Sequence, residues 1–592
     1  MYDLIIVINN YSVGRAKYGI DMFVNIWYDL TMPSLTKKTI KGKPYYYLRE
    51  CQRVEGKPKI IWTMYLGSSE TILDRVLNPE PHEVEIFEFG ASAAAFDIAS
   101  TLDIVSIIDR HVPKRTNAGT SVGQYLLLAA LNRCVAPSSK SQIAQWYQKS
   151  VLRRLLPVTE SQLSSQRFWD NMDRVTEENI RAIERDITSR AVSVFGLELH
   201  HLLFDATNFF TFVDSFNNHA ELPQRGHSKE GRDNLRILGL ALLVTSDGHV
   251  PLFHHTYAGN QHDSVTFGNV IEEISNRCKL LADAATDITL IFDKGNNSED
   301  NMDAVDHGPY HFVGSLVPTH HQNLLAIPRK KMRRLENEQL PDVWSYRTVQ
   351  EVFGIQRTVL CTFNQPLFDA QYETLVREIG KRKQKLTELQ DRLDASARGK
   401  KPTMDGTEKI VKSILRGRHM KDLFTAQLEK RANGLPKLSF EFRQDAWKEL
   451  QATLLGKTIL FTDRDDWTDE QIVLGYRSQY HVEEAFRCMK NPHFLTFRPT
   501  FHWTDQKLRV HAFYCVLALM ILSILRRKLG QKGIHLSIPA MMQKLADIRE
   551  VAVVYQSPQK SSKTLVRRKL SKQDQEQRVM LDALHLLRYH QT

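Results

Sequence analysis

The sequence predicts an α/β fold with a mixed sheet, and two apolar runs carry most of that prediction. "LHHLLFDATNFF" and "ITLIFDKGNN" each indicate a strand that ends in an acid, Asp205 and Asp293. Between them, "LRILGLALLVTSDGHVPLFHHTYAG" predicts a hairpin, because Asp247-Gly248 supplies turn residues. A helical segment, "SVTFGNVIEEISNRCKLLADA", and a later strand, "YHFVGSLVP", complete the pattern. The order strand-strand-strand-helix-strand-helix-strand is typical of a mixed sheet with helices.

The segments that flank this core differ in period and charge. The alternation from Thr39 around "EGKP" predicts a small β-hairpin module, and residues 92–195 have helical periods with Ser and Thr at N-cap positions. Between 328 and 457 the pattern loosens and becomes strongly basic, beginning with the run from Arg329 to Arg334. A helix in that stretch places Leu386, Leu389 and Leu393 on one face.

Composition limits the class of protein and its partners. The chain has 592 residues, enough for several domains, and a net charge of +11, which favours a polyanionic partner such as nucleic acid. Its six cysteines are scattered without a CxxC pair, which argues against a zinc ribbon or disulfide framework and fits a reducing cytoplasm. The apolar run from Phe513 is shorter than the roughly 18 residues of a membrane span. We therefore expect a buried helix there, no membrane partner and a cytoplasmic location.

Asp205 and Asp293 are the first candidate site residues, because functional groups gather at strand ends in open α/β sheets. A single Asp at a strand end is more often a cap or turn residue than a functional one. Two such residues in one sheet make the functional and the structural interpretations about equally good. A site for two Mg²⁺ ions requires further oxygen ligands. A third acid would therefore decide between the two interpretations.

The segment "YRSQYHVEEAFRCMK", 476–490, is predicted to be a helix that supplies this acid. Glu484 is rotated by about 100° from its neighbour Glu483. For an isolated helix, a solvated face with internal ion pairs is the commoner explanation. One stripe of the helix mixes aromatic, acidic and basic residues, because positions three, four and seven apart share a face: Tyr476, Gln479, Tyr480, Glu483, Arg487 and Lys490.

At this point the chain resembles bacterial insertion-sequence transposases with an Asp-Asp-Glu triad, in the subgroup with a Tyr-x2-Arg-x3-Glu-x6-Lys signature. Tyr476, Gln479, Glu483 and Lys490 keep all the spacings, but Gln479 stands where the family has Arg. The two aspartates match in "LLFDATNFF" and "LIFDKGNNS", and "TIKGKPYYYLRE" resembles a common start of one branch. The resemblance extends over about 33–525.

The resemblance implies an RNase H-like catalytic core in which Asp205, Asp293 and Glu483 hold two Mg²⁺ or Mn²⁺ ions per active site. It also implies a set of DNA-binding residues: Tyr476, Gln479 and Lys490, with Arg477 or Arg487 compensating for the missing Arg, and His227 and Lys229 of "RGHSKEGR" near the DNA. A basic loop of the last kind is as often merely solvated. We expect Trp146 and Trp503 to be packing residues.

The function implied is a DNA transposase that binds the terminal inverted repeats of its element and carries out two-metal DNA cleavage and strand transfer. Two alternatives stay open: a catalytically impaired transposase-derived DNA-binding protein, to which Gln479 points, and a two-metal DNA nuclease without strand transfer. The partners implied are double-stranded DNA and a second copy in a synaptic homodimer, in a cytoplasmic, nucleoid-associated location. "MPSLTKKTIKGKPYYYLRE" opens as family members do, which leaves Met1 and Met32 as alternative starts.

These patterns divide the chain into seven predicted segments. They are an upstream extension (1–31), an N-terminal β-hairpin module (32–85), a helical DNA-binding domain (86–195), the first part of the catalytic core (196–327), a basic insertion domain (328–456), the second part of the core with the Glu helix (457–530) and a basic C-terminal tail (531–592).

Overall fold

The computed structural model describes residues 33–54, 57–77, 81–114, 119–281, 287–395, 401–498, 500–555 and 565–590. The predicted upstream extension and the choice between Met1 and Met32 lie outside these residues. By their internal contacts the residues form two units, Met1–Glu85 with Val553–Arg567 and Ile86–Ala552 with Arg568–Thr592.

The first unit contains a three-stranded antiparallel sheet in the order β1-β2-β3, one strand more than the predicted hairpin. Its elements are β1 (Ser34–Ile40), β2 (Lys43–Val54), β3 (Lys57–Ser68) and helix α1 (Ser69–Leu77). The tight turn between β1 and β2 places Lys41 and Gly42 at positive φ, the conformation that closes a two-residue hairpin.

The second unit is built on a ten-stranded mixed sheet with the order β11-β12-β13-β16-β10-β9-β5-β7-β6, and β8 pairs with β7. Its strands are β5 (His201–Phe210), β6 (Gln224–Arg225), β7 (Arg236–Thr245), β8 (Pro251–Ala258), β9 (Thr289–Phe292), β10 (His311–Leu316), β11 (Arg333–Arg334), β12 (Val343–Val352), β13 (Ile355–Asn364) and β16 (Lys457–Thr462).

The strands that carry the two aspartates lie at the centre of this sheet. β5, β9 and β10 are parallel neighbours, whereas β7 and β8 continue from β5 as an antiparallel meander. Helix α9 (Asp263–Leu281) connects β8 to β9, and α10 (Glu299–Asp306) connects β9 to β10. The order of elements is the one that the sequence predicts, and the α/β class is confirmed.

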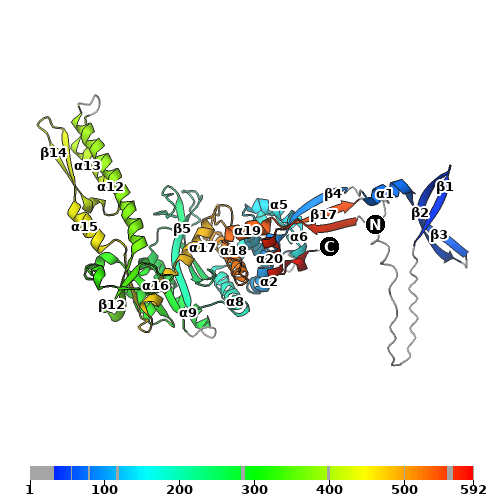
Figure 1. Cartoon of the computed structure of the whole chain (residues 1–592), viewed down its shortest axis with the longest axis horizontal. Helices are drawn as coiled ribbons and strands as arrows, with labels where there is room; N and C mark the ends of the chain where they lie inside the picture. Colours follow the sequence, from blue (N-terminus) through cyan, green and yellow to red (C-terminus); the bar gives the residue numbers. More distant parts are fainter. Residues whose placement is uncertain are drawn as a thin grey trace. The chain divides into compact units, whose positions relative to one another are not determined.

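The segment predicted as a basic insertion, 328–456, contributes to two structures. Strands β11 to β13 extend the main sheet, because the backbone of β13 pairs with β16 and its side chains in "RTVLCTF" are buried. The rest forms a separate hydrophobic cluster that includes Leu386, Leu389 and Leu393. Figure 1 shows α12 leaving the sheet beside α13 and β14. The elements of this cluster are α12 (Gln365–Asp394), α13 (Met404–Ile414), α14 (Met420–Leu423), β14 (Phe424–Lys430), β15 (Pro436–Phe442) and α15 (Gln444–Thr453). Helix α11 (Gln322–Leu325) precedes the segment and packs in the main core.

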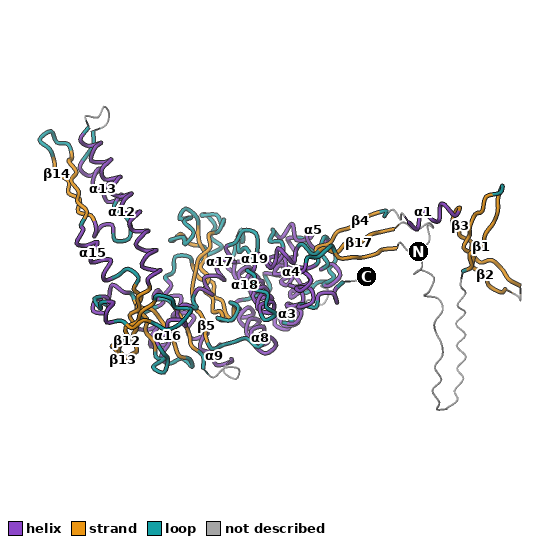
Figure 2. Tube along the Cα trace, viewed as in Figure 1, coloured by secondary structure: helices purple, strands orange, loops and turns teal. Residues whose placement is uncertain are grey.

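A helical region precedes the sheet in the chain and packs around one long apolar helix, α18 (Asp505–Gly530), as Figure 2 shows. α18 is long and apolar enough to cross a membrane, but 94% of its most apolar window is buried inside the protein. It contacts α2, α4 and α8, so the expectation of a buried helix is confirmed. The helices are α2 (Gly90–Thr101), α3 (Ile104–His111), α4 (Val122–Val135), α5 (Ile143–Gln148), α6 (Leu152–Leu155), α7 (Ser165–Met172) and α8 (Glu177–Phe195).

The expectation of a C-terminal tail at 531–592 is wrong for the residues described there, because they fold and pack. Met541, Leu545, Met580 and Leu584 belong to the main hydrophobic core. The apolar residues recur at strand and helix periods that outweigh the basic charge around them. The elements are α19 (Ile538–Ala546), β17 (Arg549–Tyr555), β18 (Leu565–Leu570) and α20 (Gln575–Ala583). The two strands form a sheet with the earlier strand β4 (Glu83–Glu88), in the order β18-β17-β4.

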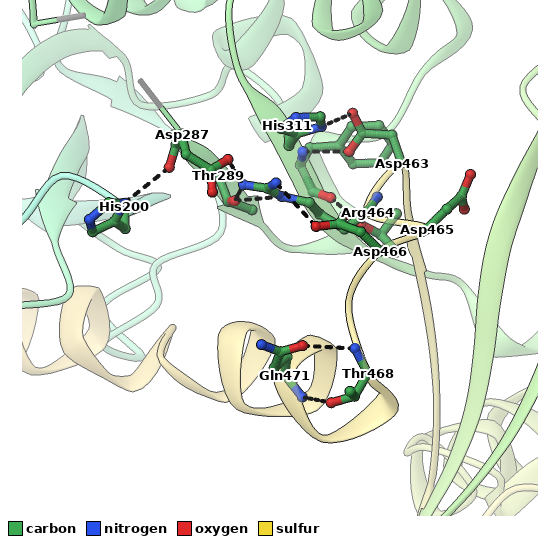
Figure 3. A network of polar contacts seen from close by, with 12 residues as sticks. His200, Asp287, Thr289, His311, Asp463, Arg464, Asp465, Asp466, Thr468 and Gln471 are labelled. Atoms are coloured by element: carbon green, nitrogen blue, oxygen red, sulfur yellow. Dashed lines mark hydrogen bonds and ion pairs between the residues drawn. The ribbon is translucent and has the colours of Figure 1, made fainter. Parts of the chain in front are cut away.

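A polar network fixes the edge of the main sheet at which β9 and β10 begin (Figure 3). Arg464 is buried, pairs with Asp287 and donates to Thr289 Oγ1 at 2.9 Å. Asp463 accepts hydrogen bonds from His311 Nδ1 and from the N–H of Phe312. These contacts lie at the starts of the strands and therefore leave their other ends, where the two aspartates lie, free of this network.

Candidate active site

Asp205 and Asp293 occupy equivalent positions on two neighbouring parallel strands. The last register pair between β5 and β9 is Phe204 with Phe292, and each aspartate is the next residue. Asp293 ends its strand as predicted, but β5 continues to Phe210, so the expectation that Asp205 lies at a strand end is wrong. The strand continues because "ATNFF" keeps pairing with β7 after β9 has ended.

The partly buried carboxyl group of Asp205 has a pKa raised to about 6, chiefly by burial. Lys229 and a hydrogen bond from the N–H of Ala206 (2.7 Å) act in the opposite direction, while the charges of Asp293 and Asp263 raise this pKa further. The carboxyl group of Asp205 therefore lies close enough to other carboxylates for their negative charges to raise its pKa. A cation bound between them would relieve that repulsion.

Asp293 is oriented through one of its two oxygens. Oδ1 accepts hydrogen bonds from Ser315 Oγ at 2.8 Å and from Tyr476 Oη at 3.0 Å. Oδ2 forms no hydrogen bond with any residue that the structure describes. Burial, followed by the charge of Asp293, raises the pKa of Tyr476, which keeps its hydroxyl protonated as a donor. The arrangement leaves Oδ2 available to a ligand.

The segment 476–490 forms two helices, α16 (Asp469–Arg477) and α17 (Tyr480–Lys490), so the prediction of one continuous helix is wrong. The N–H of Ser478 is shared between the carbonyls of Leu474 and Gly475, which tightens the turn and ends α16. Tyr476 therefore belongs to a different helix from Glu483 and Lys490. α17 packs against β5 and β7.

Lys490, the last residue of α17, reaches the strand that carries Asp205. Its Nζ donates to Thr207 Oγ1 at 2.7 Å and lies 5.4 Å from the centre of the Phe209 ring. Asp205, Thr207 and Phe209 alternate along β5 and so share one face of the sheet. Burial lowers the pKa of Lys490, and the charge of Glu230 opposes this shift.

Glu483 and Glu484 point in different directions, as their helical positions predict. Glu484 pairs with Arg487 and lines a cavity with His249 and Arg526. The exposed side chain of Glu483, in the first turn of α17, forms no hydrogen bond or ion pair with any described residue. Of the two glutamates, Glu483 is therefore the one left available for a ligand.

The structure brings one residue of the predicted basic loop to the site. Lys229 Nζ donates to the carbonyl of Ala206 at 2.7 Å and lies 3.5 Å from Asp263 Oδ2. His227 of the same loop is exposed, and its Nδ1 lies 3.8 Å from Asp233. Lys229 is thus a neighbour of Asp205, whereas His227 faces solvent.

The other three predicted DNA-binding residues have separate surroundings. Arg477 donates to the carbonyl of Gln339 at 3.4 Å, and burial lowers its pKa. Arg487 forms its ion pair with Glu484, three residues earlier on α17. Gln479 has a buried Nε2 atom with no hydrogen-bond partner among the described residues. Each of the two arginines thus already has a partner in this structure.

Asp263 is a site residue that sequence reasoning missed. It is the first residue of α9, and a Cβ on Gly295, two residues after Asp293, would lie 3.7 Å from its Oδ2. Together with its contact to Lys229, this places a fourth carboxylate beside the two aspartates. The sequence holds no signal for this role, because an acid in the first helical turn is common for dipole reasons alone.

The donors gathered here are carboxylate oxygens, which suit Mg²⁺ or Mn²⁺ rather than softer metals. Two observations fit such an ion: the neighbouring carboxylates of Asp205 and Asp293, and the unpartnered Oδ2. In the described part of the chain, however, no three His, Cys, Asp or Glu side chains are grouped to hold a metal. The structure thus brings together two of the three predicted ligands and leaves Glu483 nearby on α17.

A mixed sheet with paired carboxylates on adjacent parallel strands defines an α/β protein with a candidate cation site. The model of the transposase DDE domain family matches residues 201–521, more than half of the chain. The chain therefore belongs to the DDE transposase domain family, whose activity is phosphoryl transfer on DNA. No curated protein sequence matches it.

The solved structures similar to this chain include the piggyBac transposase synaptic complex with hairpin DNA. The identity is 10% over 77% of this chain and 79% of that one, with a TM-score of 0.36.

Proposed function

We propose that this protein is a DNA transposase of the bacterial insertion-sequence type, with an RNase H-like core that cuts the ends of its element and joins them to target DNA. The observation that carries the proposal is that Asp205 and Asp293 occupy equivalent positions on neighbouring parallel strands. Tyr476 of the signature segment orients Asp293 through a hydrogen bond. The strand order β8-β7-β5-β9-β10, antiparallel and then parallel, supports the RNase H-like assignment.

The proposed ligands of two Mg²⁺ or Mn²⁺ ions are Asp205, Asp293 and Glu483. Such a pair supplies activation of the attacking oxygen and stabilisation of the leaving oxygen in an in-line displacement. Tyr476 and Ser315 fix the Asp293 carboxylate, so that its free oxygen keeps one direction. This orientation would be in place before metal and DNA arrive.

Two lysines beside Asp205 would bind the DNA backbone. Thr207 holds the ammonium of Lys490, and the carbonyl of Ala206 holds that of Lys229, so both cations stand within two residues of Asp205 along β5. Ammonium groups held in this way bind phosphate oxygens and fix the position of a strand without reading its sequence. The phosphate to be cut would thereby be placed over the carboxylates.

The wider proposal assigns partners to the rest of the chain. The net charge of +11 supports double-stranded DNA as the partner. We assign recognition of the terminal inverted repeats to the hairpin module and the helical domain. The active assembly would be a synaptic homodimer in the cytoplasm, at the nucleoid. The predicted segment boundaries are part of this proposal.

The test is a cleavage assay with Mg²⁺ on DNA that carries the inverted repeats of the element. Wild type is compared with Glu483→Gln and with the matched variant Glu484→Gln, which changes the neighbouring acid that faces elsewhere. We expect Glu483→Gln to lose cleavage by at least about a thousandfold and Glu484→Gln to stay within a few fold of wild type. Equal cleavage by wild type and Glu483→Gln would refute the role of Glu483.

Gln479 favours a second candidate, a DNA-binding protein with impaired catalysis. Its amide stands at the signature position of an Arg, and an amide cannot replace a charge-assisted contact to phosphate. Gln479→Arg should then raise cleavage above wild type. If wild type binds the repeats and never cuts them, the impaired protein is correct. Cleavage without any joined product would instead identify a nuclease.

A further inference from the structure

A cavity of about 460 Å³ opens between the helical region and the segment that follows α17. Its walls come from α4, the turn at 138–141, α7, residues 501–504 and the start of α18. The volume is within the range of about 300–1,000 Å³ that is usual for ligand pockets. It is too small for a DNA duplex.

Two buried cations line this cavity without a counter-ion. Lys140 is 8% exposed and Arg133 is 4% exposed. Lys140 Nζ donates to Tyr514 Oη at 2.7 Å, and Arg133 Nη1 donates to the carbonyl of Thr496 at 3.2 Å. Neither forms an ion pair with a carboxylate in the described ranges. Burying two unpaired cations is costly, and an anion in the cavity would offset that cost.

The lowered pKa of Lys140 indicates an excess of positive charge in the cavity. Burial, followed by the charge of Arg133, lowers the pKa of Lys140 to about 7. The nearby His502 has a pKa lowered to about 3 for the same two reasons, burial and neighbouring cations. The cavity is thus a positively biased site in which burial and neighbouring cations lower the pKa values of Lys140 and His502.

Aromatic rings stand at the same cavity with much of their surface in solvent. Trp503 is 64% exposed, Phe501 59% and Trp169 39%. The expectation that Trp503 is a packing residue is therefore wrong, whereas Trp146 packs partly against the core. Exposed indole and phenyl faces are the surfaces on which unpaired bases stack.

The cavity is connected to the candidate active site through a short stretch of chain. Phe497 stacks on Phe209 at a ring separation of 4.3 Å, four residues along β5 from Asp205. The N–H of Phe212 donates to the carbonyl of Thr500 at 3.1 Å, and Asn217 Nδ2 donates to the carbonyl of Trp503 at 3.0 Å. The end of β5 and the residues after it therefore hold the aromatic wall in place.

We propose that this cavity binds an unpaired nucleotide of the DNA that lies at the active site, with a phosphate at Lys140 and Arg133 and the base against Trp503 and Trp169. The proposal rests on the proposed function, because it requires DNA at the neighbouring site. A base alone would leave the cations unpaired, and free phosphate would leave the aromatic rings in solvent. A nucleotide satisfies both sets of groups.

The experiment measures binding of three fluorescein-labelled duplexes of one sequence by the full chain in EDTA. One duplex is blunt, and the other two carry a short 3′ or 5′ single-stranded overhang. We expect wild type to bind at least one overhang duplex about tenfold more tightly than the blunt one, a size typical of base stacking. Lys140→Met and Trp503→Ala should lose this preference and keep their affinity for the blunt duplex.

Controls separate the pocket from charge and from folding. Lys149→Met removes the same charge from an exposed position in the same region and should keep the overhang preference. Trp503→Ala changes an exposed side chain, so its melting temperature should stay that of wild type. Equal affinity of wild type for all three duplexes, or a preference that survives in both pocket variants, overturns this inference alone. Failure of wild type to bind any duplex overturns the proposed function as well.

Discussion

The hydroxyl of Tyr476 donates a hydrogen bond to Oδ1 of Asp293 across 3.0 Å, and so joins the end of α16 to the end of β9. Ser315 of β10 donates to the same oxygen. The carboxylate is therefore fixed from one side, and its second oxygen is free. The signature segment thus orients the second aspartate directly, through a hydrogen bond that requires no bound DNA.

Tyr476→Phe should weaken metal-dependent activity while the fold is kept, because it removes one donor and leaves the ring. Loss of an outer hydrogen bond to a metal ligand typically costs about 10–100-fold in metal affinity or activity. Cleavage rates over a Mg²⁺ titration measure this effect. Tyr480→Phe is the matched control, since Tyr480 is exposed on the next helix. An unchanged Mg²⁺ dependence in Tyr476→Phe would contradict the orienting role.

Lys490→Met should reduce DNA affinity and its salt dependence together. Thr207 holds the ammonium beside Asp205, where it would neutralise one phosphate. The slope of log affinity against log salt concentration should fall by about one unit. Lys490→Arg keeps the charge and should keep the slope. A slope that does not change in Lys490→Met would mean that the lysine contacts no phosphate.

Lys140→Met should stabilise the protein in a pH-dependent way. Folding lowers the pKa of Lys140 from 10.5 to about 7, so between these values the unfolded chain binds more protons and stability rises with pH. Below about pH 7 the cost of the buried charge is complete, and the gain in melting temperature of Lys140→Met should be largest there. The gain should shrink toward about pH 10.

Thermal melts of both proteins from about pH 6 to about pH 10 measure this prediction. The groups that face Lys140 do not interfere, because burial moves their pKa values out of this range: His502 to about 3, Cys515 to about 11, His511 downward and Tyr514 upward, while the pKa of Arg133 is raised. A gain that is independent of pH would contradict the lowered pKa.

Glu184→Ala should destabilise the contact between the helical region and the sheet. Glu184 of α8 accepts from His254 Nδ1 at 2.6 Å and from Arg277 Nη2 at 3.3 Å, and all three side chains are buried. Removing the carboxylate leaves the buried guanidinium with Glu273, at 3.4 Å, as its remaining acidic partner, which costs about 3 kcal/mol. Glu178→Ala changes an exposed acid in the first turn of the same helix and should lower the melting temperature much less. Equal melting temperatures for the two variants would refute this ion-pair role.

The order of elements in the core was predictable from sequence because each strand is a separate apolar run bounded by turn residues. The position of Asp205 within its strand was not, since the end of a strand depends on which neighbour continues to pair, here β7 after β9 stops. The break between α16 and α17 was not predictable from the sequence either. A shared N–H at Ser478 ends the helix, and Gly475 lies inside its last turn rather than just past its end, where a Gly would signal the stop.

The candidate site was only partly predictable for a related reason. Asp205, Asp293 and Glu483 stand out through spacing, but Asp263 approaches them only because α9 starts beside Gly295. The exposure of Trp503 and the packing of Met580 and Leu584 are tertiary outcomes as well. Whether a large apolar residue is buried or exposed depends on which neighbouring elements pack against it, and a local sequence pattern does not contain that information.

The central claim is that Asp205, Asp293 and Glu483 hold the metal ions of the reaction. Anomalous diffraction from crystals of the full chain with DNA and Mn²⁺ tests it most directly. We expect anomalous peaks about 2.1 Å from carboxylate oxygens of Asp205 and Asp293, with Glu483 completing the site. Peaks only among Asp463, Asp465 and Asp466, at the opposite edge of the sheet, would contradict it.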